Sequence, residues 1–371
     1  MKKWISLNMT PGIGPRKATE LFEKFGSVDR IFGALRSELE SVRLRPESIQ
    51  SILAKQFHDR ADREYEAVRK LGGEIIILDD GVYPQMLREI PDPPLVLYVF
   101  GNWLECFETP SVGVVGSRRC TTYGKNTAEM LSRDLASVGV TVTSGFARGI
   151  DSAAHKGALE AGGKTIAVFG TGLDRVYPRE NARLMNEILE SGGSVVTQFP
   201  LGTPPLRDNF PYRNRIISGL SHALLVIEAS EKSGSLITAR LAAEQDREVL
   251  AVPGNITSKN SFGTNYLIKS GAKLVQHWQD VVSEFPSEVG AKILPPKTEN
   301  TVGSRPIEAS FNLSPAEKKI LKLIDPDANM HIDDILDATG LGFGDANQAL
   351  VSLDLKNLIH VLPGNHYAKK L

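Results

Sequence analysis

Cysteine is nearly missing from this sequence, since the 371 residues contain only Cys106 and Cys120. Two cysteines without a C-x-x-C or Cys/His spacing exclude a disulfide framework and a cysteine-based metal site, so we expect two reduced thiols. Long hydrophobic runs are missing as well. No stretch reaches the roughly 18 apolar residues of a membrane span, and the first six residues, MKKWIS, are too short an apolar start for a signal peptide. The sequence therefore predicts a cytoplasmic protein with no membrane contact.

An excess of charge of one sign is also missing, because the net charge is −1. With 41% hydrophobic and 23% charged residues, the chain has the composition of an ordinary globular protein and is long enough for two or three domains. The distribution of charge is more informative than its sum. Eight arginines fall in or beside expected loops of one domain: Arg118, Arg119, Arg148, Arg175, Arg179, Arg207, Arg213 and Arg215.

The stretch from 111 to 155 contains two similar units. Two short β-branched runs, 112–115 and 140–143, each give way at a glycine to a polar loop that opens a helical segment. Such a loop can bind an anion, because glycine lets the backbone approach and the first N–H groups of a helix have no partner within it. The spacing does not follow G-x-G-x-x-G, so arginine side chains are expected to share the binding of phosphate.

Further apolar strand candidates recur at 165–169, 194–197, 223–228, 249–252 and 273–275, and helical segments alternate with them. This alternation predicts an α/β fold with a doubly wound, mostly parallel sheet. Ligands of such sheets bind beyond the carboxyl ends of the strands, so the loops that follow the strands should form one rim. Two more strand candidates between 74 and 102 are joined by a proline-rich connection.

Glycine, serine and arginine recur on these rim loops, and aromatic residues lie among them. Stacking of aromatic rings on bases suits single-stranded nucleic acid. The candidate stacking residues are Tyr123, Phe146, Tyr177 and Phe210. For Phe210, as for the nearby Tyr212, a core position is the more common role of such a residue. Arg118 has no apolar neighbour in the sequence to lie on, which favours contact with phosphate. Asp151 fits a helix cap and His155 a packing residue.

The two ends of the chain predict separate domains. Residues 1–72 read as short helices, and the stretch TPGIGP resembles the turn of a helix-hairpin-helix, with a degenerate second copy near 37–53; a helical cap without DNA contact is the alternative. Residues 286–310 read as a linker between a central domain, 73–285, and a C-terminal domain, 311–371. Three amphipathic helices and a hairpin in the last domain suggest a winged helix. Because acids outnumber bases there, a protein contact is favoured over DNA reading.

Several motifs in order, VGSR, SGFARGIDSAAHKGAL, GTGLDRVYPREN, FPYRNRIISGLS and SGSLITARLAAEQ, resemble the DNA-processing protein A (DprA/Smf) family from about Tyr83 to Ala272. The resemblance implies a Rossmann-like domain, with a SAM-like helical domain before it, that binds single-stranded DNA, forms a homodimer and loads the recombinase RecA on incoming DNA during natural transformation. The phosphate-binding set that it implies, together with the neighbouring arginines, is Gly116, Ser117, Arg118, Arg119, Ser144, Gly145, Arg148, Arg179, Arg213, Asn214, Arg215, Ser233, Gly234 and Ser235.

Two positions depart from the family pattern. Gln198 stands where the family commonly has glutamate, and Asp246 stands where it usually has glycine. The competing hypothesis is a nucleotide-processing enzyme of the phosphoribohydrolase type, with Glu228 or Asp151 as acid or base. Against it, the sequence shows no activated nucleophile, metal cluster or closely paired carboxylates. We therefore expect a protein that is not an enzyme and needs no cofactor.

Overall fold

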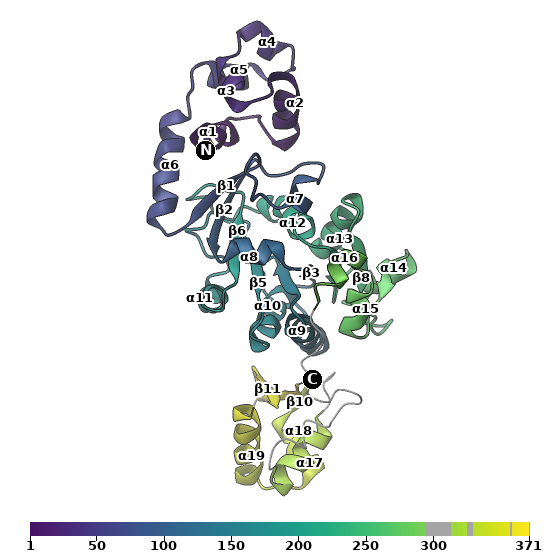
Figure 1. Cartoon of the computed structure of the whole chain (residues 1–371). Helices are drawn as coiled ribbons and strands as arrows, with labels where there is room; N and C mark the ends of the chain where they lie inside the picture. The colour runs from purple at the N-terminus through teal and green to yellow at the C-terminus, as the bar shows by residue number, and fades with distance from the viewer. Residues whose placement is uncertain (294–312, 325–328, 357, 371) are drawn as a thin grey trace.

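The computed structural model describes residues 1–293, 313–324, 329–356 and 358–370. Figure 1 shows three parts in a row: a group of helices at the N-terminus, a central sheet covered by helices, and a small unit of helices and strands at the C-terminus. Among the described helices, none is long and apolar enough to span a bilayer.

The N-terminal part consists of six helices: α1 (Lys2–Met9), α2 (Pro15–Phe25), α3 (Val28–Gly33), α4 (Arg36–Glu40), α5 (Pro46–Leu53) and α6 (His58–Lys70). The turn from α1 to α2 holds Gly12 at φ +78°, and the turn from α4 to α5 holds Arg43 at φ +52°. In both turns a proline, Pro15 or Pro46, starts the next helix three residues later. The second hairpin thus repeats the backbone of the first without its glycines.

The central sheet has nine strands in the order β1-β2-β6-β5-β4-β3-β7-β8-β9. Their bounds are β1 (Glu74–Ile77), β2 (Val96–Gly101), β3 (Ser111–Val115), β4 (Thr141–Ser144), β5 (Thr165–Val168), β6 (Ser194–Thr197), β7 (Ala223–Val226), β8 (Glu248–Ala251) and β9 (Lys273–Leu274). β2 is antiparallel to β1 and β6, and all other neighbours are parallel. The predicted mostly parallel, doubly wound sheet is confirmed, and the direction of winding reverses between β3 and β7.

Helices cover both faces of this sheet, because its strands are apolar on both sides. One face packs on α9 (Thr122–Ser137), α10 (Ile150–Glu160), α11 (Ala182–Glu190) and α15 (Trp278–Val282). The other packs on α7 (Gln85–Arg88), α8 (Trp103–Glu108), α12 (Asn209–Gly219) and α13 (Gly234–Glu244). The short 3₁₀ helix η1 (Arg179–Asn181) precedes α11, and α14 (Phe262–Lys269) lies between β8 and β9.

The helices α9 and α10 approach each other unusually closely. A β-carbon placed on Gly157 of α10 would lie 2.2 Å from the carbonyl oxygen of Glu129 on α9. The backbones of the two helices are therefore in direct contact, which only glycine allows at this position.

The C-terminal part contains α17 (Pro315–Leu323), β10 (Met330–His331), α18 (Ile332–Thr339), α19 (Phe343–Leu355), β11 (Ile359–Leu362) and β12 (His366–Lys369). The strands form a small antiparallel sheet in the order β10-β12-β11. Three helices with a β-hairpin as the wing make the predicted winged helix, which is thereby confirmed.

The expected linker, 286–310, lies mostly outside the described residues. Its first residues are an exception, because α16 (Ser287–Gly290) forms there and Val289 and Ile293 pack against the core under α9. The structured central part thus continues beyond 286, and the apolar side chains of this short stretch explain why.

Candidate nucleic-acid interface

A buried carboxylate holds the end of the loop that follows β3 through hydrogen bonds. Glu228, which is 2% exposed, accepts hydrogen bonds from the backbone N–H of Thr121 at 2.9 Å and from its hydroxyl at 2.5 Å. A β-carbon on Gly116 would lie 2.6 Å from the Ile150 side chain, so this position needs glycine. The loop therefore leaves the sheet in one defined direction and exposes Arg118 and Arg119 to solvent.

The loops after β3 and β4 form a single unit. The backbone N–H of Ile150 donates to the carbonyl oxygen of Ser117 at 3.2 Å. Gly149 has φ +77°, and a β-carbon there would lie 2.3 Å from the same Ser117 oxygen. Because the winding of the sheet reverses next to β3, this pair of loops lies at the switch point where ligands bind in doubly wound sheets.

A buried arginine and a buried carboxylate support the start of the loop after β4. Arg213, which is 2% exposed, donates to the carbonyl oxygen of Gly145 at 2.7 Å. Asp151 accepts from the backbone N–H of Ala147 at 3.2 Å. Burial lowers the pKa of Arg213 to about 10, so the guanidinium stays charged at neutral pH. Burial also raises the pKa of Asp151, and the charge of Arg213 opposes that rise.

A small hollow opens above this pair. Its walls are Arg118, Gly145, Ala147, Arg148, Tyr177, Pro178 and Phe210. The guanidinium carbon of Arg118 lies 5.3 Å from the centre of the Phe210 ring, and that ring lies 5.5 Å from the centre of Tyr177. A cation over a ring face is attracted electrostatically. The expectation that Arg118 has no apolar neighbour is thus wrong, because Phe210, remote in sequence, lies beside it.

Arg148 at the same hollow is not a free cation. Its guanidinium forms an ion pair with Glu180, with one hydrogen bond from Nη2 to Oε2 of 2.9 Å. Both side chains are largely exposed, and an exposed pair of this kind contributes little to stability. A phosphate could therefore compete with Glu180 for Arg148 at small cost.

Six of the sequence-based site residues are buried within the domain, and of these only Gly145 lines the hollow: Ser144, Gly145, Phe146, Arg213, Arg215 and Ser235. Phe146 is fully buried and packs on Phe169, so the prediction that it stacks on bases is wrong. Arg215 is 2% exposed and donates to Asp92 and Gln198, so it is not a phosphate ligand. The hydroxyl of Ser144 donates to the carbonyl oxygen of Val114 at 2.6 Å. Arg213 donates to the backbone of the loop from inside the domain, so it supports the loop and does not bind phosphate.

The remaining members of the predicted set lie on or near the rim. Tyr123 at the start of α9 donates to the carbonyl oxygen of Pro253 at 3.1 Å, and Arg179 is exposed in η1. Ser233 caps α13, which follows β7, and it accepts from the backbone N–H of Ser235; Gly234 is exposed between them. Asn214 is half-buried in α12, one residue from each of two buried arginines.

Neither carboxylate of the enzyme hypothesis is placed as an acid or base. The oxygens of Glu228 accept from Thr121, with the side chain of Asn260 at 3.4 Å, and Asp151 is buried against Arg213. Within the described residues there is no group of three or more His, Cys, Asp or Glu side chains that could hold a metal ion. The chemistry available at the hollow is therefore cationic and aromatic, which suits binding of a polyanion with exposed bases.

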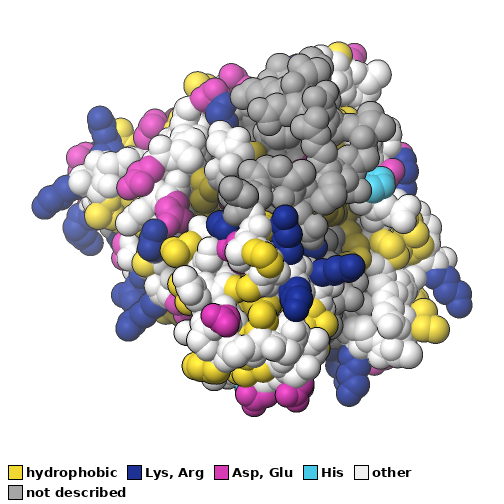
Figure 2. All heavy atoms as spheres, turned by 90° about the horizontal axis from the view of Figure 1, so that it is seen from below, with side chains coloured by type: hydrophobic (Ala, Val, Ile, Leu, Met, Phe, Trp, Pro, Cys, Tyr) yellow, Lys and Arg dark blue, Asp and Glu magenta, His cyan; other side chains and the backbone are white. Residues whose placement is uncertain are grey.

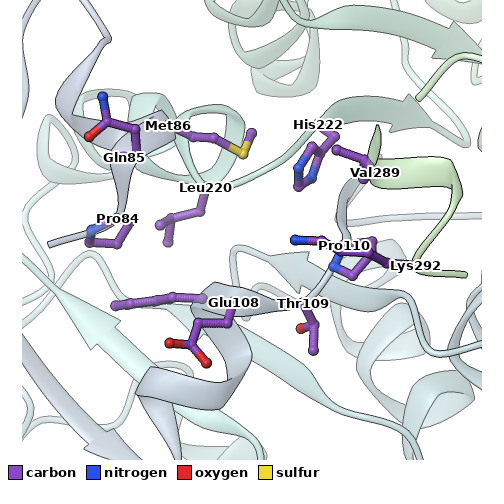
Figure 3. Close-up of a pocket in the computed structure, with 11 residues that line it drawn as sticks. Pro84, Gln85, Met86, Glu108, Thr109, Pro110, Leu220, His222, Val289 and Lys292 are labelled. Atoms are coloured by element: carbon purple, nitrogen blue, oxygen red, sulfur yellow. The ribbon is translucent and has the colours of Figure 1, made fainter. Parts of the chain in front are cut away.

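A larger cavity of about 530 Å³ lies at the end of the sheet opposite the rim. Figure 3 shows Pro84 and Met86 on one side of it and His222 and Val289 on the other. Pro110 and His222 precede β3 and β7, so this cavity lies at the amino ends of the strands. It contains no residue of the predicted site.

Sequence reasoning missed the partners that hold the rim in place. Glu228 under the first loop, Glu180 beside Arg148 and Gln198 beside Arg215 are all distant in sequence from the residues they contact. The only local signal was the pairing of glycines with serines and arginines, which marks loops but does not identify their supports.

A doubly wound sheet with paired glycine loops and an arginine at its switch point is the arrangement found in α/β proteins that bind phosphate-bearing ligands. Residues 74–286 match the family model of the DNA recombination-mediator protein A, and residues 305–365 match that of the DprA winged helix domain. The chain therefore belongs to the DNA recombination-mediator protein A (DprA/Smf) family.

Individual relatives agree with this assignment. Protein Smf of Escherichia coli K12 is 36% identical over 362 residues, covering 94% of this chain and 95% of the relative. The DNA processing protein DprA of Streptococcus pneumoniae is 47% identical over 209 residues, covering 56% of this chain and 73% of the relative. Among solved structures, DprA from S. pneumoniae superposes with a TM-score of 0.69 at 36% identity, over 77% of this chain and 98% of that one. A Helicobacter pylori DprA structure, described for its single-stranded DNA binding mode, gives 0.52 at 29% identity over 57% and 98%.

Proposed function

We propose that this chain is a non-catalytic, cytoplasmic protein that binds single-stranded DNA, protects incoming DNA and loads RecA on it during natural transformation. The observation that carries DNA binding is the grouping of Arg118, Phe210 and Tyr177 around one hollow at the switch point of the sheet. The cation can hold a phosphate, while the rings can stack on a base. The H. pylori relative described as binding single-stranded DNA supports the same direction.

The test is a salt titration of binding to matched single- and double-stranded oligonucleotides. Arg118→Ala should weaken binding to single strands of every sequence by about tenfold, because one phosphate contact is lost. The slope of log affinity against log salt should become shallower by about 0.7. Arg183→Ala is the matched control, because Arg183 lies on α11 with its side chain 92% exposed and paired with Glu187.

Two results would contradict DNA binding at the hollow. One is an affinity for single strands that Arg118→Ala leaves unchanged at physiological salt. The other is an equal loss in Arg183→Ala, which would indicate a general charge effect.

We further propose that a second copy covers the β9 edge of the sheet. Ile256, Phe262, Tyr266 and Leu274 are 92%, 52%, 59% and 41% exposed, and they lie on α14, on β9 and in the loop before α14. Exposed apolar side chains gathered on neighbouring elements are typical of an interface. Sedimentation should show a homodimer that Tyr266→Glu converts to a monomer. A monomeric wild type at micromolar concentration would contradict this interface.

The absence of enzymatic activity needs its own test. Incubation with a panel of nucleoside monophosphates should release no free base, because Glu228 and Asp151 are engaged in the fold. Release of base that depends on either carboxylate would favour the hydrolase alternative. RecA loading, and the division into domains at 1–72, 73–285 and 311–371, stay predictions of the sequence.

A further inference from the structure

The winged helix is docked on the central domain through the first half of α9. Asn126, which is 2% exposed, donates to the carbonyl oxygen of Lys369 at 2.9 Å, and its own oxygen lies 2.8 Å from Nε2 of His360. Thr122 donates to Asn329 at 2.5 Å. These contacts join β12, β11 and the residue before β10 to α9. Figure 1 shows the C-terminal part next to α9.

A carboxylate and an imidazole also meet at this contact. Oε2 of Glu129 lies 3.5 Å from Nε2 of His360, which is 8% exposed. Burial raises the pKa of Glu129, but the hydrogen bond from His360 and the charge of Lys125 outweigh burial and lower it overall. The carboxylate is therefore charged at neutral pH and held by groups from both domains.

Docking in this orientation creates a groove beside the rim. The groove has a volume of about 590 Å³ and is lined by Thr121 and Thr122 from one domain and by Pro363 and His366 of the wing from the other. Thr121 is three residues from Arg118, which is at most about 11 Å of extended chain. The groove thus begins where the arginines of the first rim loop end.

The helix that would read duplex DNA in a winged helix contributes no residue to this groove and has the wrong chemistry. α19 contains two aspartates and neither lysine nor arginine. Phe343, Val351 and Leu355 on it are 63%, 53% and 82% exposed. Figure 2, which views the molecule from the winged-helix end, shows hydrophobic side chains among charges of both signs. Binding to a DNA groove needs an excess of cations on the inserted helix.

Resting on the function proposed above, we infer that the winged helix extends the single-stranded DNA site. The strand held at Arg118 continues past Thr121 through the groove. Among the described residues no lysine or arginine lines this groove, so the polar side chains of Asn329 and His366 contact the phosphates beside Pro363 of the wing. The wing, and not α19, is the DNA-contacting part of this domain. The ligand is the sugar-phosphate backbone of the same strand, read without regard to sequence.

The test uses the full-length chain and oligothymidylates of increasing length, from about 5 to about 25 nucleotides, a span that brackets common single-strand site sizes. Pro363→Glu places a carboxylate in the groove on an exposed turn. It should leave the affinity for the shortest strands unchanged and weaken binding of the longest by about tenfold. Asn126→Ala, which removes the two docking hydrogen bonds that Asn126 makes, should show the same dependence on length.

Leu355→Glu is the matched control, because it adds the same charge on exposed α19. It should bind strands of every length like the wild type. Pro363→Glu and Asn126→Ala that match the wild type at all lengths would overturn the inference, as would a loss confined to Leu355→Glu. If the inference is overturned in this way but the wild type still binds the shortest strands, the proposed function is unaffected. A wild type that binds no single strand overturns both.

Discussion

The ring of Phe210 lies between two groups at the rim, with the guanidinium carbon of Arg118 5.3 Å from its centre and the Tyr177 ring 5.5 Å away. The cation and the two aromatic rings are therefore in mutual contact and can bind one ligand together. Phe210 comes from α12 and Arg118 from the loop after β3, so the fold brings together residues about ninety positions apart in the chain.

Replacing Phe210 by Leu should weaken binding of single-stranded DNA by about 1–3 kcal/mol, because one stacking platform is lost. The leucine keeps an apolar side chain against Gly170, where a β-carbon would lie 2.8 Å from the Phe210 ring, so the fold should persist. Fluorescence anisotropy with a labelled oligonucleotide measures the change. Phe343→Leu, on exposed α19, is the control and should have no effect; equal affinities for all three proteins would contradict stacking at Phe210.

Arg213→Met should destabilise the fold by about 3–5 kcal/mol, because Asp151 is left as a buried carboxylate without its cation. The pKa of Asp151, already raised by burial, should rise further. An acid with a raised pKa in the folded state costs stability as pH increases from its unfolded pKa through its folded pKa, so the loss should be smallest in acid. Urea unfolding at several pH values tests this. Adding Asp151→Asn should recover much of the loss. An uncharged double variant as unstable as Arg213→Met would refute an electrostatic role of Arg213 toward Asp151.

Gln198→Glu should maintain or increase stability at neutral pH. Oε1 of Gln198 accepts from Nη2 of Arg215 at 2.7 Å, while its buried Nε2 has no partner among the described residues. A glutamate keeps the acceptor, removes the unpaired N–H and pairs with the arginine, which we expect to contribute up to about 1–3 kcal/mol. A carboxylate beside Arg215 should have a lowered pKa, so this gain should disappear as pH falls. Thermal unfolding at pH 7 and pH 4 checks both parts, and Gln198→Ala, expected to destabilise at both, is the control.

His155 should make the protein less stable in weak acid. Its ring nitrogen Nδ1 lies 2.7 Å from the hydroxyl of Thr165, and burial lowers its pKa to about 3. Between pH 6.5 and about 3 the unfolded chain binds a proton that the folded chain does not, so stability falls by about 1.4 kcal/mol per pH unit on lowering pH. His155→Gln should reduce the slope by about one proton, whereas His277→Gln at an exposed site should not. Equal slopes in denaturant titrations at pH 4–6 would contradict a buried neutral His155.

The sequence allowed most of the sheet to be predicted, because each strand is a short apolar run with a glycine or polar loop behind it. The seven strand candidates from 112 to 275 all correspond to strands, with bounds that differ by at most two residues. Prediction of the site succeeded only in part. Local pattern placed Arg118 and Arg148 on loops, but it could not separate exposed from buried members of the run Arg213-Asn214-Arg215, since their environment depends on Asp151, Asp92 and Gln198 far away in the chain.

The two departures from the family pattern also show that sequence alone does not reveal the environment of a residue. Asp246 has φ +55°, a left-handed conformation that glycine adopts without strain and that aspartate tolerates better than most residues. Gln198 lies beside Arg215, where a carboxylate would have formed an ion pair. The sequence identified both positions, but only the backbone and the partner explain what each substitution changes.

The glycine contact between α9 and α10 has a mechanical consequence. α9 begins at one arginine-bearing loop and carries the docked winged helix, while α10 begins at the other loop, and their backbones touch at Gly157. With no side chain between the two backbones at Gly157, a pull on the C-terminal domain would be transmitted to both loops at once. In a force-extension experiment, tension applied there should loosen the grip on DNA before the sheet itself begins to open.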